Sequence, residues 1–174
     1  MKIVLLSGSI RRASLNLKLV NLTRDVAARM GHEATVVDLG GCDIPVYNGD
    51  EEDAEGLPED VLKLKQMISE SDALVVSSPE YNGFFSGLLK NTLDWCSRAG
   101  GGLDGRATYE GKHCIVMSAT PGAKGGVRVL PRLAEQMEIL RTVVVDQVGI
   151  GNAETALGES ATEARLEQAL KQLG

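Results

Sequence analysis

The sequence predicts a doubly wound α/β fold with a five-stranded parallel sheet in the order 2-1-3-4-5. Short apolar runs rich in β-branched residues alternate with amphipathic helical patterns, so that a β-α order repeats along the chain. Five strands favour this order over that of the six-stranded dinucleotide fold. The 174 residues suffice for one domain with a full core, and no internal repeat divides them. We therefore expect a single domain over residues 1–174.

The predicted strands are all short enough to be central parallel strands, covered on both faces. They lie at residues 3–6, 35–37, 73–77, 114–117 and 142–145.

The predicted helices occupy the intervals between these strands. They are expected over 15–30, from 58, over 86–96, within 127–140 and from 160. The first has Ser14 as its N-cap and Gly31 just beyond its end. Pro131 leaves the start of the fourth open, because proline is tolerated only in the first turn. Ser160 and Glu163 have the spacing of a capping box in the last helix. Two segments are candidates for low order, the acidic stretch 48–56 and the glycine-rich stretch 100–105.

Composition excludes several classes of partner. The net charge is −6 and no run of Lys and Arg could follow a phosphate backbone, so we expect no nucleic acid partner. No apolar segment approaches the roughly 20 residues of a membrane span, so we expect no membrane association. Residues 1–6 are too short for a signal peptide and are followed by a polar stretch with two arginines. We interpret them as the first strand of a cytoplasmic protein.

The cysteines and histidines indicate neither a disulfide framework nor a zinc site. Cys42, Cys96 and Cys114 form no C-x-x-C pair, and His32 and His113 are the only histidines. Catalysis by a Cys-His pair stays formally open because such partners can be distant in sequence. We favour the simpler alternative of core cysteines and surface histidines.

The loop after the strand 73–77 is the most informative segment, with the sequence Ser78-Pro79-Glu80-Tyr81-Asn82-Gly83. Open α/β sheets bind ligands at the carboxyl ends of their strands. Asn82 and Gly83 tolerate unusual backbone angles and can turn N–H groups toward one point. The ring of Tyr81 could cover a flat ligand. This loop therefore predicts a site for a planar cofactor rich in acceptors.

The loop of residues 7–16, between the first strand and the first helix, predicts an anion site. Free N–H groups and the positive end of the helix dipole converge there. Hydroxyls of Ser9 and Ser14, the Asn16 amide and the charge of Arg11 would suit a terminal phosphomonoester. The P-loop and dinucleotide glycine patterns are both absent. The alternative is that Ser14 only caps the helix and the arginines are solvated.

With both loops in place, the chain resembles the NADPH-dependent FMN reductases, a flavodoxin-like family that includes quinone, chromate and azo-dye reductases. The likeness rests on residues 8–16, 44–50, 78–83 and 87–95. It implies an FMN phosphate held by Ser9, Arg11, Ser14 and Asn16. It also implies an isoalloxazine lined, largely through the backbone, by Pro79, Glu80, Tyr81, Asn82 and Gly83. A third loop, residues 118–126, should close the other edge, with Ser118 as its predicted contact.

The same resemblance implies an FMN-dependent NAD(P)H oxidoreductase acting on quinones, free flavin, metal oxyanions or similar small acceptors by a ping-pong cycle. FMN carries the hydride chemistry, so no protein side chain is predicted to be catalytic. The sequence does not distinguish NADPH from NADH as the electron donor. The 2′-phosphate of NADPH needs only one suitably placed cation, and Arg12, Lys124 and Arg128 are all candidates. Relatives are dimers or tetramers, in which Tyr47 and the acidic stretch would reach toward a neighbouring site.

Several alternatives remain open. A flavodoxin-type electron carrier or a flavin-binding redox-sensing module would use the same fold, whereas a receiver domain would need acidic residues where Ser7-Gly8-Ser9 stand. Glu80 could be a proton donor, but we favour a carboxylate that anchors its own loop. Trp95 is expected in the core or a subunit interface, and the positions of Phe84 and Phe85 are left open.

Overall fold

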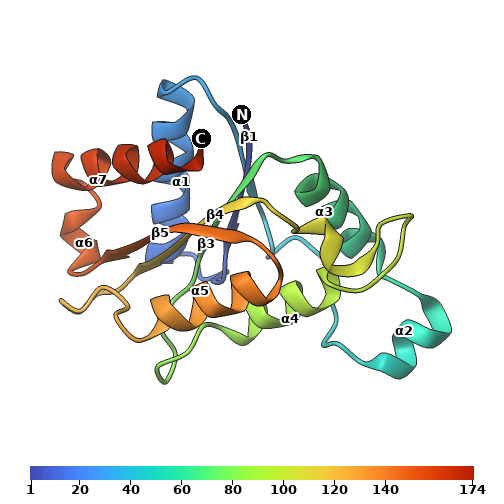
Figure 1. The fold of residues 1–174 in the computed structure, drawn as a ribbon. Helices are drawn as coiled ribbons and strands as arrows, with labels where there is room; N and C mark the ends of the chain where they lie inside the picture. Colours follow the sequence, from blue (N-terminus) through green and yellow to red (C-terminus); the bar gives the residue numbers. More distant parts are fainter.

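The computed structural model describes residues 1–174, and it confirms the predicted sheet. Five parallel strands lie in the order β2-β1-β3-β4-β5. They are β1 (Lys2–Ser7), β2 (Glu33–Val37), β3 (Ala73–Ser77), β4 (His113–Ala119) and β5 (Val143–Ile150). The chain crosses from β2 over β1 to β3, so the strand order reverses between β1 and β3 (Figure 1). The carboxyl ends of β1 and β3 therefore flank the switch point at which doubly wound sheets bind ligands.

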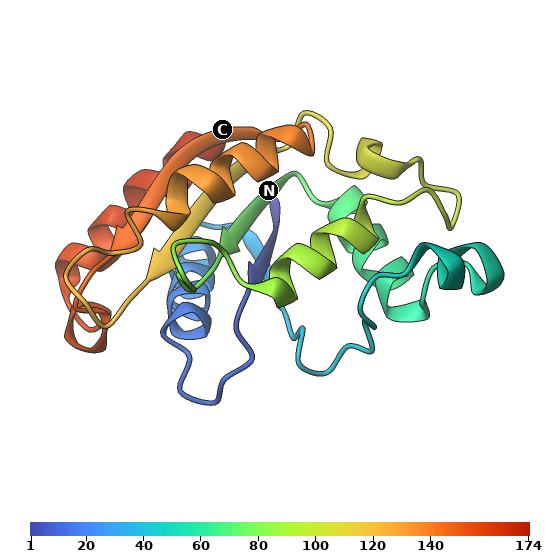
Figure 2. The same cartoon turned by 90° about the horizontal axis from the view of Figure 1, so that it is seen from below.

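Helices cover both faces of this sheet (Figures 1 and 2). They are α1 (Leu15–Arg29), α2 (Gly49–Glu55), α3 (Glu59–Glu70), α4 (Gly87–Cys96), α5 (Val129–Ile139), α6 (Ala153–Ala156) and α7 (Ser160–Leu170), with 3-10 turns at Gly105–Thr108 and Lys171–Leu173. Alternate strand residues point to opposite faces. Thus Val4 and Leu6 pack with α3, α4 and α5, whereas Ile3 and Leu5 pack with α1 and α7. Both termini lie at the amino end of the sheet (Figure 1). No helix combines the length and the apolar character that crossing a membrane requires.

The acidic stretch 48–56 is a helix, and the expectation of low order there was wrong. The Asn48 side chain caps α2 by accepting a hydrogen bond from the Asp50 N–H at 3.1 Å, and acidic side chains occupy the first turn, where the helix dipole favours them. Glu52 accepts hydrogen bonds from Arg98 and from the Tyr47 hydroxyl. The Arg98 guanidinium holds the pKa of Glu52 below its usual range. These contacts fix α2 as an arm at the edge of the molecule (Figures 1 and 2).

The glycine-rich stretch 100–105 is also ordered, as a turn closed by two backbone hydrogen bonds between Gly100 and Leu103 at 3.0 and 3.1 Å. Trp95 belongs to the core: it is 1% exposed and its Nε1 donates to the Pro45 carbonyl at 2.8 Å. Phe85 is buried, and Phe84 stacks on it from the exposed side.

Two predicted boundaries near the end of the chain need correction. β5 continues to Ile150, past the predicted end at residue 145, because Asp146 and Gln147 interrupt the apolar run of an edge strand without ending it. α7 begins at Ser160 as predicted, but the capping box does not form, since the N-cap residue is Glu159 and its side chain makes no cap hydrogen bond. Pro131 is the third residue of α5, within the first turn that tolerates it.

Candidate active site

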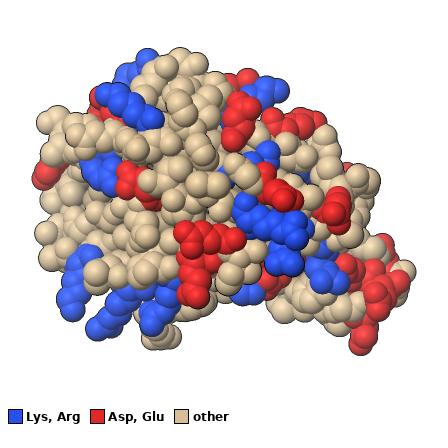
Figure 3. All heavy atoms as spheres, in the orientation of Figure 1, with Lys and Arg blue, Asp and Glu red and all other residues tan.

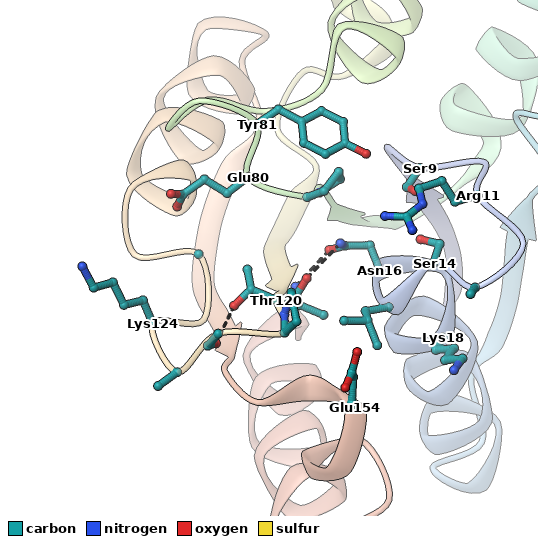
Figure 4. A pocket seen from close by; sticks show the side chains of 18 residues that line it. Ser9, Arg11, Ser14, Asn16, Lys18, Glu80, Tyr81, Thr120, Lys124 and Glu154 are labelled. Carbon is teal, nitrogen blue, oxygen red and sulfur yellow. Dashed lines mark hydrogen bonds between the residues drawn. The ribbon is translucent and has the colours of Figure 1, made fainter.

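A cavity of about 950 Å³ opens at the carboxyl end of the sheet, between the phosphate loop (residues 7–16), the second loop (78–83) and the third loop (118–126) (Figure 4). Its volume lies at the upper end of the range typical of small-molecule sites. Seven of the ten predicted site residues line it: Ser9, Arg11, Ser14, Asn16, Pro79, Glu80 and Tyr81. The other three, Asn82, Gly83 and Ser118, lie close to the cavity in sequence but do not line it.

The hydrogen-bond donors of the phosphate loop lie at the N-terminus of α1. Ser14 has extended backbone angles, and its Oγ accepts a hydrogen bond from the Leu17 N–H at 3.1 Å. Ser14 is therefore the predicted N-cap, and its hydroxyl proton is still available to a ligand. No acidic residue occupies the first turn of α1, so nothing neutralises the positive end of the helix dipole. Ser9 and Arg11 line the same side of the cavity (Figure 4).

Gly8 sets the path of the phosphate loop by packing closely against its neighbours. Its N–H donates to the Ser77 carbonyl at 2.7 Å, and its carbonyl accepts from the Ser86 hydroxyl at 2.6 Å. A Cβ atom at Gly8 would lie 2.8 Å from Ser86 Oγ. The loop is thus fixed to the end of β3 and to the start of α4 before any ligand binds.

Asn16 has a structural role that the sequence did not indicate. Its Nδ2 donates to the Ala119 carbonyl at 3.0 Å, and its Oδ1 accepts from the Ala119 N–H at 2.9 Å and from the Ser77 hydroxyl at 2.8 Å. The buried amide therefore ties α1 to the ends of β3 and β4. One Nδ2–H remains for a ligand.

The second loop ends in a tight hairpin formed by residues 81–84. Asn82 and Gly83 have φ values of 53° and 78°, as the two central residues of a type I′ turn require. The Tyr81 N–H donates to the Phe84 carbonyl at 2.9 Å, and the Phe84 N–H donates to the Tyr81 carbonyl at 3.0 Å. The Tyr81 ring stands at the cavity with its hydroxyl toward the Ser9 and Arg11 side (Figure 4).

Glu80 anchors a different segment from the one we predicted. Its Oε2 accepts from the N–H groups of Arg128 and Val129, at 3.2 and 3.3 Å, at the start of α5. Figure 4 shows its carboxylate turned toward this segment and away from Ser14. The anchoring role is thus correct in kind, but the partner is the segment that follows the third loop.

Close glycine packing seats the third loop on the end of β5. A Cβ at Gly149 would lie 2.4 Å from the Gly125 carbonyl oxygen, and one at Gly151 would lie 2.3 Å from the Ala123 carbonyl oxygen. Thr120 adds a hydrogen bond from its N–H to the Ile150 carbonyl at 3.0 Å. The loop therefore presents its residues 119–124 and Gly126 to the cavity.

Ser118 lies beneath the third loop. It is fully buried, and its Oγ makes no hydrogen bond within the protein. A Cβ at Gly126 would lie only 2.3 Å from that Oγ, so the hydroxyl sits directly behind a cavity-lining glycine.

Two residues of the cavity wall were missed by sequence reasoning, Lys18 and Glu154. Lys18 follows Ser14 by four residues, and this spacing, which places both on one face of α1, could have identified it. Glu154 lies in the first turn of α6, a four-residue helix too short for a periodic signal. Figure 4 places the Glu154 carboxylate at the end of the cavity opposite Tyr81.

Three of the five charged side chains that line the cavity are cations, and the other two are the carboxylates of Glu80 and Glu154. Arg11, Lys18 and Lys124 line it, and none of them forms an ion pair, whereas cations elsewhere, such as Arg98 and Arg165, pair with carboxylates. Figure 3 shows Lys and Arg side chains projecting beside the third loop and the start of α5, with Asp and Glu gathered over α2. In a molecule of net charge −6, this arrangement favours an anionic ligand.

The thiols take no part in this cavity. Burial raises the pKa of Cys96 to about 12, and it also raises the pKa of Cys114, so both are protonated at neutral pH. Neither lines the cavity. His113 is also engaged elsewhere, with its Nδ1 2.8 Å from the Leu173 carbonyl oxygen.

The donor set fits the two ends of FMN. A free helix N-terminus with Ser9, Arg11 and Ser14 matches a phosphomonoester. The polar backbone of the second and third loops, with the orphaned Ser118 hydroxyl behind Gly126, matches the rim of an acceptor-rich ring. The cavity is large enough to hold both ends together.

Comparison with known proteins agrees with this fit. The family model of the NADPH-dependent FMN reductases matches residues 1–155. The chain is 32% identical to a 2-hydroxy-1,4-benzoquinone reductase from Burkholderia sp over 147 residues, which are 84% of this chain and 75% of that protein. It is 30% identical to an NADPH azoreductase from Bacillus sp. (strain OY1-2) over 169 residues, 92% of this chain and 84% of that one.

The fold is likewise similar to solved structures. The flavoenzyme NAD(P)H:(acceptor) oxidoreductase FerB from Paracoccus denitrificans superposes with a TM-score of 0.72 at 25% identity, covering 99% of this chain and 98% of that one. The cavity, the sequence relatives and the fold therefore agree. The chain belongs to the NADPH-dependent FMN reductase family and is an oxidoreductase of that type, with FMN as its cofactor and NAD(P)H as its electron donor.

Proposed function

We propose that this protein transfers electrons from NADPH or NADH to quinones and related small acceptors at the cavity between its three loops. The observation that carries the proposal is the continuity of this cavity, which joins a phosphate cradle at α1 to the Tyr81 hairpin at the same opening. Two sequence relatives support the acceptor class, since their names are 2-hydroxy-1,4-benzoquinone reductase and NADPH azoreductase. Free flavin and metal oxyanions such as chromate are further candidate acceptors.

At the phosphate end, we expect side chains and helix N–H groups to share the charge of the ligand. Ser9 and Ser14 offer hydroxyl protons, Arg11 offers a guanidinium without a carboxylate partner, and Asn16 offers its remaining Nδ2–H. Charge-assisted hydrogen bonds of this kind are about twice as strong as neutral ones. Arg11 is therefore expected to contribute most to phosphate affinity.

At the other end, the second and third loops would hold the ring of the cofactor. When bound, FMN supplies the hydride-accepting and hydride-donating chemistry. Pro79, Glu80 and Tyr81 line one side and the third loop lines another, while Asn82 and Gly83 set the turn that places Tyr81. We propose that the Ser118 hydroxyl donates a hydrogen bond to the ring of the cofactor from its place behind Gly126. The hydroxyl is buried and has no hydrogen-bond partner within the protein.

The sharing of one cavity by both substrates would also support a ping-pong order. The nicotinamide and the acceptor would both reach the same exposed ring face, so the oxidised nicotinamide must leave before the acceptor enters. Initial rates measured against both substrates should give parallel double-reciprocal lines, and intersecting lines would exclude this order.

We also propose a cytoplasmic homodimer or homotetramer, on the strength of the family likeness. In such an assembly, Tyr47 and α2 would approach a neighbouring site. The Tyr47 hydroxyl donates to the Glu52 carboxylate, and the Arg98 guanidinium lies 5.6 Å from the centre of the Tyr47 ring. Light scattering on the purified protein measures the assembly directly, and a monomer at micromolar concentration would exclude it.

Anaerobic stopped-flow reduction tests the main proposal. The FMN-loaded protein should be reduced rapidly by NADPH or NADH and reoxidised by at least one quinone. A flavodoxin-type carrier would instead resist both nicotinamides and exchange electrons only with a separate reductase protein. That second outcome would replace the enzyme assignment with the carrier.

A further inference from the structure

Two side chains connect the 81–84 hairpin to α5 by hydrogen bonds. We propose that Glu80 and Arg132 are positioning residues that clamp this hairpin to α5 and so fix the gap between the second and third loops. The inference rests on the proposed function, because that gap is where the ring of the cofactor is expected.

Glu80 forms the first tie, from the base of the hairpin. Its carboxylate accepts from two N–H groups at the start of α5, those of the N-cap residue Arg128 and of Val129. No side chain of α5 itself caps this helix, and no acidic residue lies in its first turn. Glu80 therefore supplies from another loop both the cap and the negative charge that a helix N-terminus favours.

Arg132 forms the second tie, to the tip of the hairpin. Its Nη1 donates to the Gly83 carbonyl and lies 3.4 Å from the Arg128 carbonyl oxygen. Its guanidinium lies 6.0 Å from the centre of the Phe84 ring, within the range of a cation–π contact. Phe84 in turn stacks on the buried Phe85 with ring centres 4.3 Å apart.

The hairpin needs such ties because it has little else to hold it. Tyr81 is 48% exposed and Phe84 is 45% exposed, and an isolated two-stranded hairpin is at best marginally stable in water. By contrast, α5 buries Leu133 and Met137 in the core. The clamp thus fixes Tyr81, which lines the cavity together with the third loop, relative to α5.

Amide hydrogen exchange on the FMN-free protein tests the clamp without any ligand. The informative amides are those of Tyr81 and Phe84, which bond to each other's carbonyls. Loss of a helix cap or a similar contact corresponds to about five- to tenfold faster opening, so Glu80→Ala and Arg132→Ala should each accelerate their exchange by about that factor. Glu80→Gln keeps an acceptor oxygen and should restore protection to within about twofold.

Glu135→Ala is the matched control, because Glu135 is an exposed residue of α5 without a hydrogen-bond or ion-pair partner. It should leave the exchange of Tyr81 and Phe84 unchanged. If Glu80→Ala fails to fold, Arg132→Ala and the milder Arg132→Lys decide the same question. Unchanged exchange in the folded Ala variants would overturn the clamp.

Kinetics of the FMN-loaded protein provide a second readout, which a general loss of stability would not produce. FMN affinity should fall less than the rate of flavin reduction in both Ala variants, because the phosphate loop is untouched. The rate of flavin reduction by NADPH should fall about tenfold or more, since small displacements of a positioning group are costly. The double variant should be little worse than the more damaged single variant, because both act on one hairpin.

A parallel loss of affinity and rate, or full additivity of the two substitutions, would overturn the proposal. If the unmodified protein is not reduced by either nicotinamide, the proposed function fails, while the exchange experiment still decides whether the clamp exists.

Discussion

The phosphate loop and the 81–84 hairpin face the same cavity but differ in how far apart in the sequence their functional groups and partners lie. The phosphate loop leads directly into α1, and its functional groups lie within eight residues of one another, from Ser9 to Asn16. The hairpin depends on contacts of Glu80 and Arg132, which join the second loop to α5 across 48 and 49 residues of sequence. One side of the cavity therefore takes its ligand donors from one short segment, whereas the other side requires two distant segments to be placed together.

This difference separates affinity from geometry. A helix N-terminus binds an anion wherever the helix forms, so the phosphate loop can work as a unit. The hairpin and the third loop must be placed relative to each other by β5 and α5. Substitutions in the local part should change ligand affinity, and substitutions in the tertiary part should change stability and hydride transfer.

Gly151→Ala should have the largest effect, on the tertiary side. The new Cβ would lie 2.3 Å from the Ala123 carbonyl oxygen, so the backbone of the third loop must move. We expect a loss of about 2–3 kcal/mol in the free energy of unfolding, measured by chemical denaturation. Gly87→Ala is the control, because no atom lies within 4 Å of the position that its new Cβ would take. Equal stabilities for both variants would contradict the close packing of the third loop.

Arg11→Ala should give the next largest effect, on the local side. It removes a charged donor worth roughly 1.5–3 kcal/mol, so FMN affinity should fall about ten- to a hundredfold. Riboflavin lacks the phosphate, and its affinity should hardly change. Fluorescence titration with both flavins makes the comparison, and a parallel loss of riboflavin binding would assign Arg11 a structural role instead.

Gly83→Val should damage hydride transfer more than FMN binding. Gly83 has a φ of 78°, and a Cβ there would lie 3.2 Å from Arg132 Nη1, so valine strains the turn by about 1–3 kcal/mol. Gly83→Asn is the matched variant, because asparagine tolerates positive φ. Single-turnover reduction by NADPH should slow markedly in the valine variant and less in the asparagine variant. If FMN affinity fell more than this rate, the separation of the two sides would be refuted.

Asp146→Asn should give the smallest effect, and it should alter neither the phosphate loop nor the 81–84 hairpin. Arg165 lowers the pKa of Asp146 in the folded protein, so the pair stabilises the fold above the unfolded pKa of about 4 and loses that contribution as pH falls through the folded value. We expect a deficit of about 1 kcal/mol or less at pH 7 that is smaller near pH 2. Urea unfolding at both pH values measures it, and an equal deficit at the two would contradict the ion pair.

The local side of the cavity is also the side that sequence could predict most fully. Ser14 as a cap and Arg11 beside a helix N-terminus both follow from residues close together in the chain. The positive φ of Asn82 and Gly83 was predictable for the same reason, since turn chemistry is local.

What escaped prediction depends on distant partners. Asn16 could not reveal its bonds to Ala119, nor Glu80 its bonds to α5, because each partner lies 48 or more residues away. The extension of β5 was hidden by two polar residues, one of which, Asp146, pairs with Arg165 of α7. Glycine packing between Gly151 and Ala123 has no periodicity to detect.

The unpaired cations of the cavity also bear on how fast a ligand arrives. FMN and NADPH are multiply charged anions approaching an anionic protein, yet Arg11, Lys18 and Lys124 create an attractive field at the entrance. At physiological salt such a field reaches about 8 Å, so it acts on the final stage of diffusional encounter. Association rates should therefore fall steeply as ionic strength rises, while uncharged quinones enter at a rate that salt leaves unchanged.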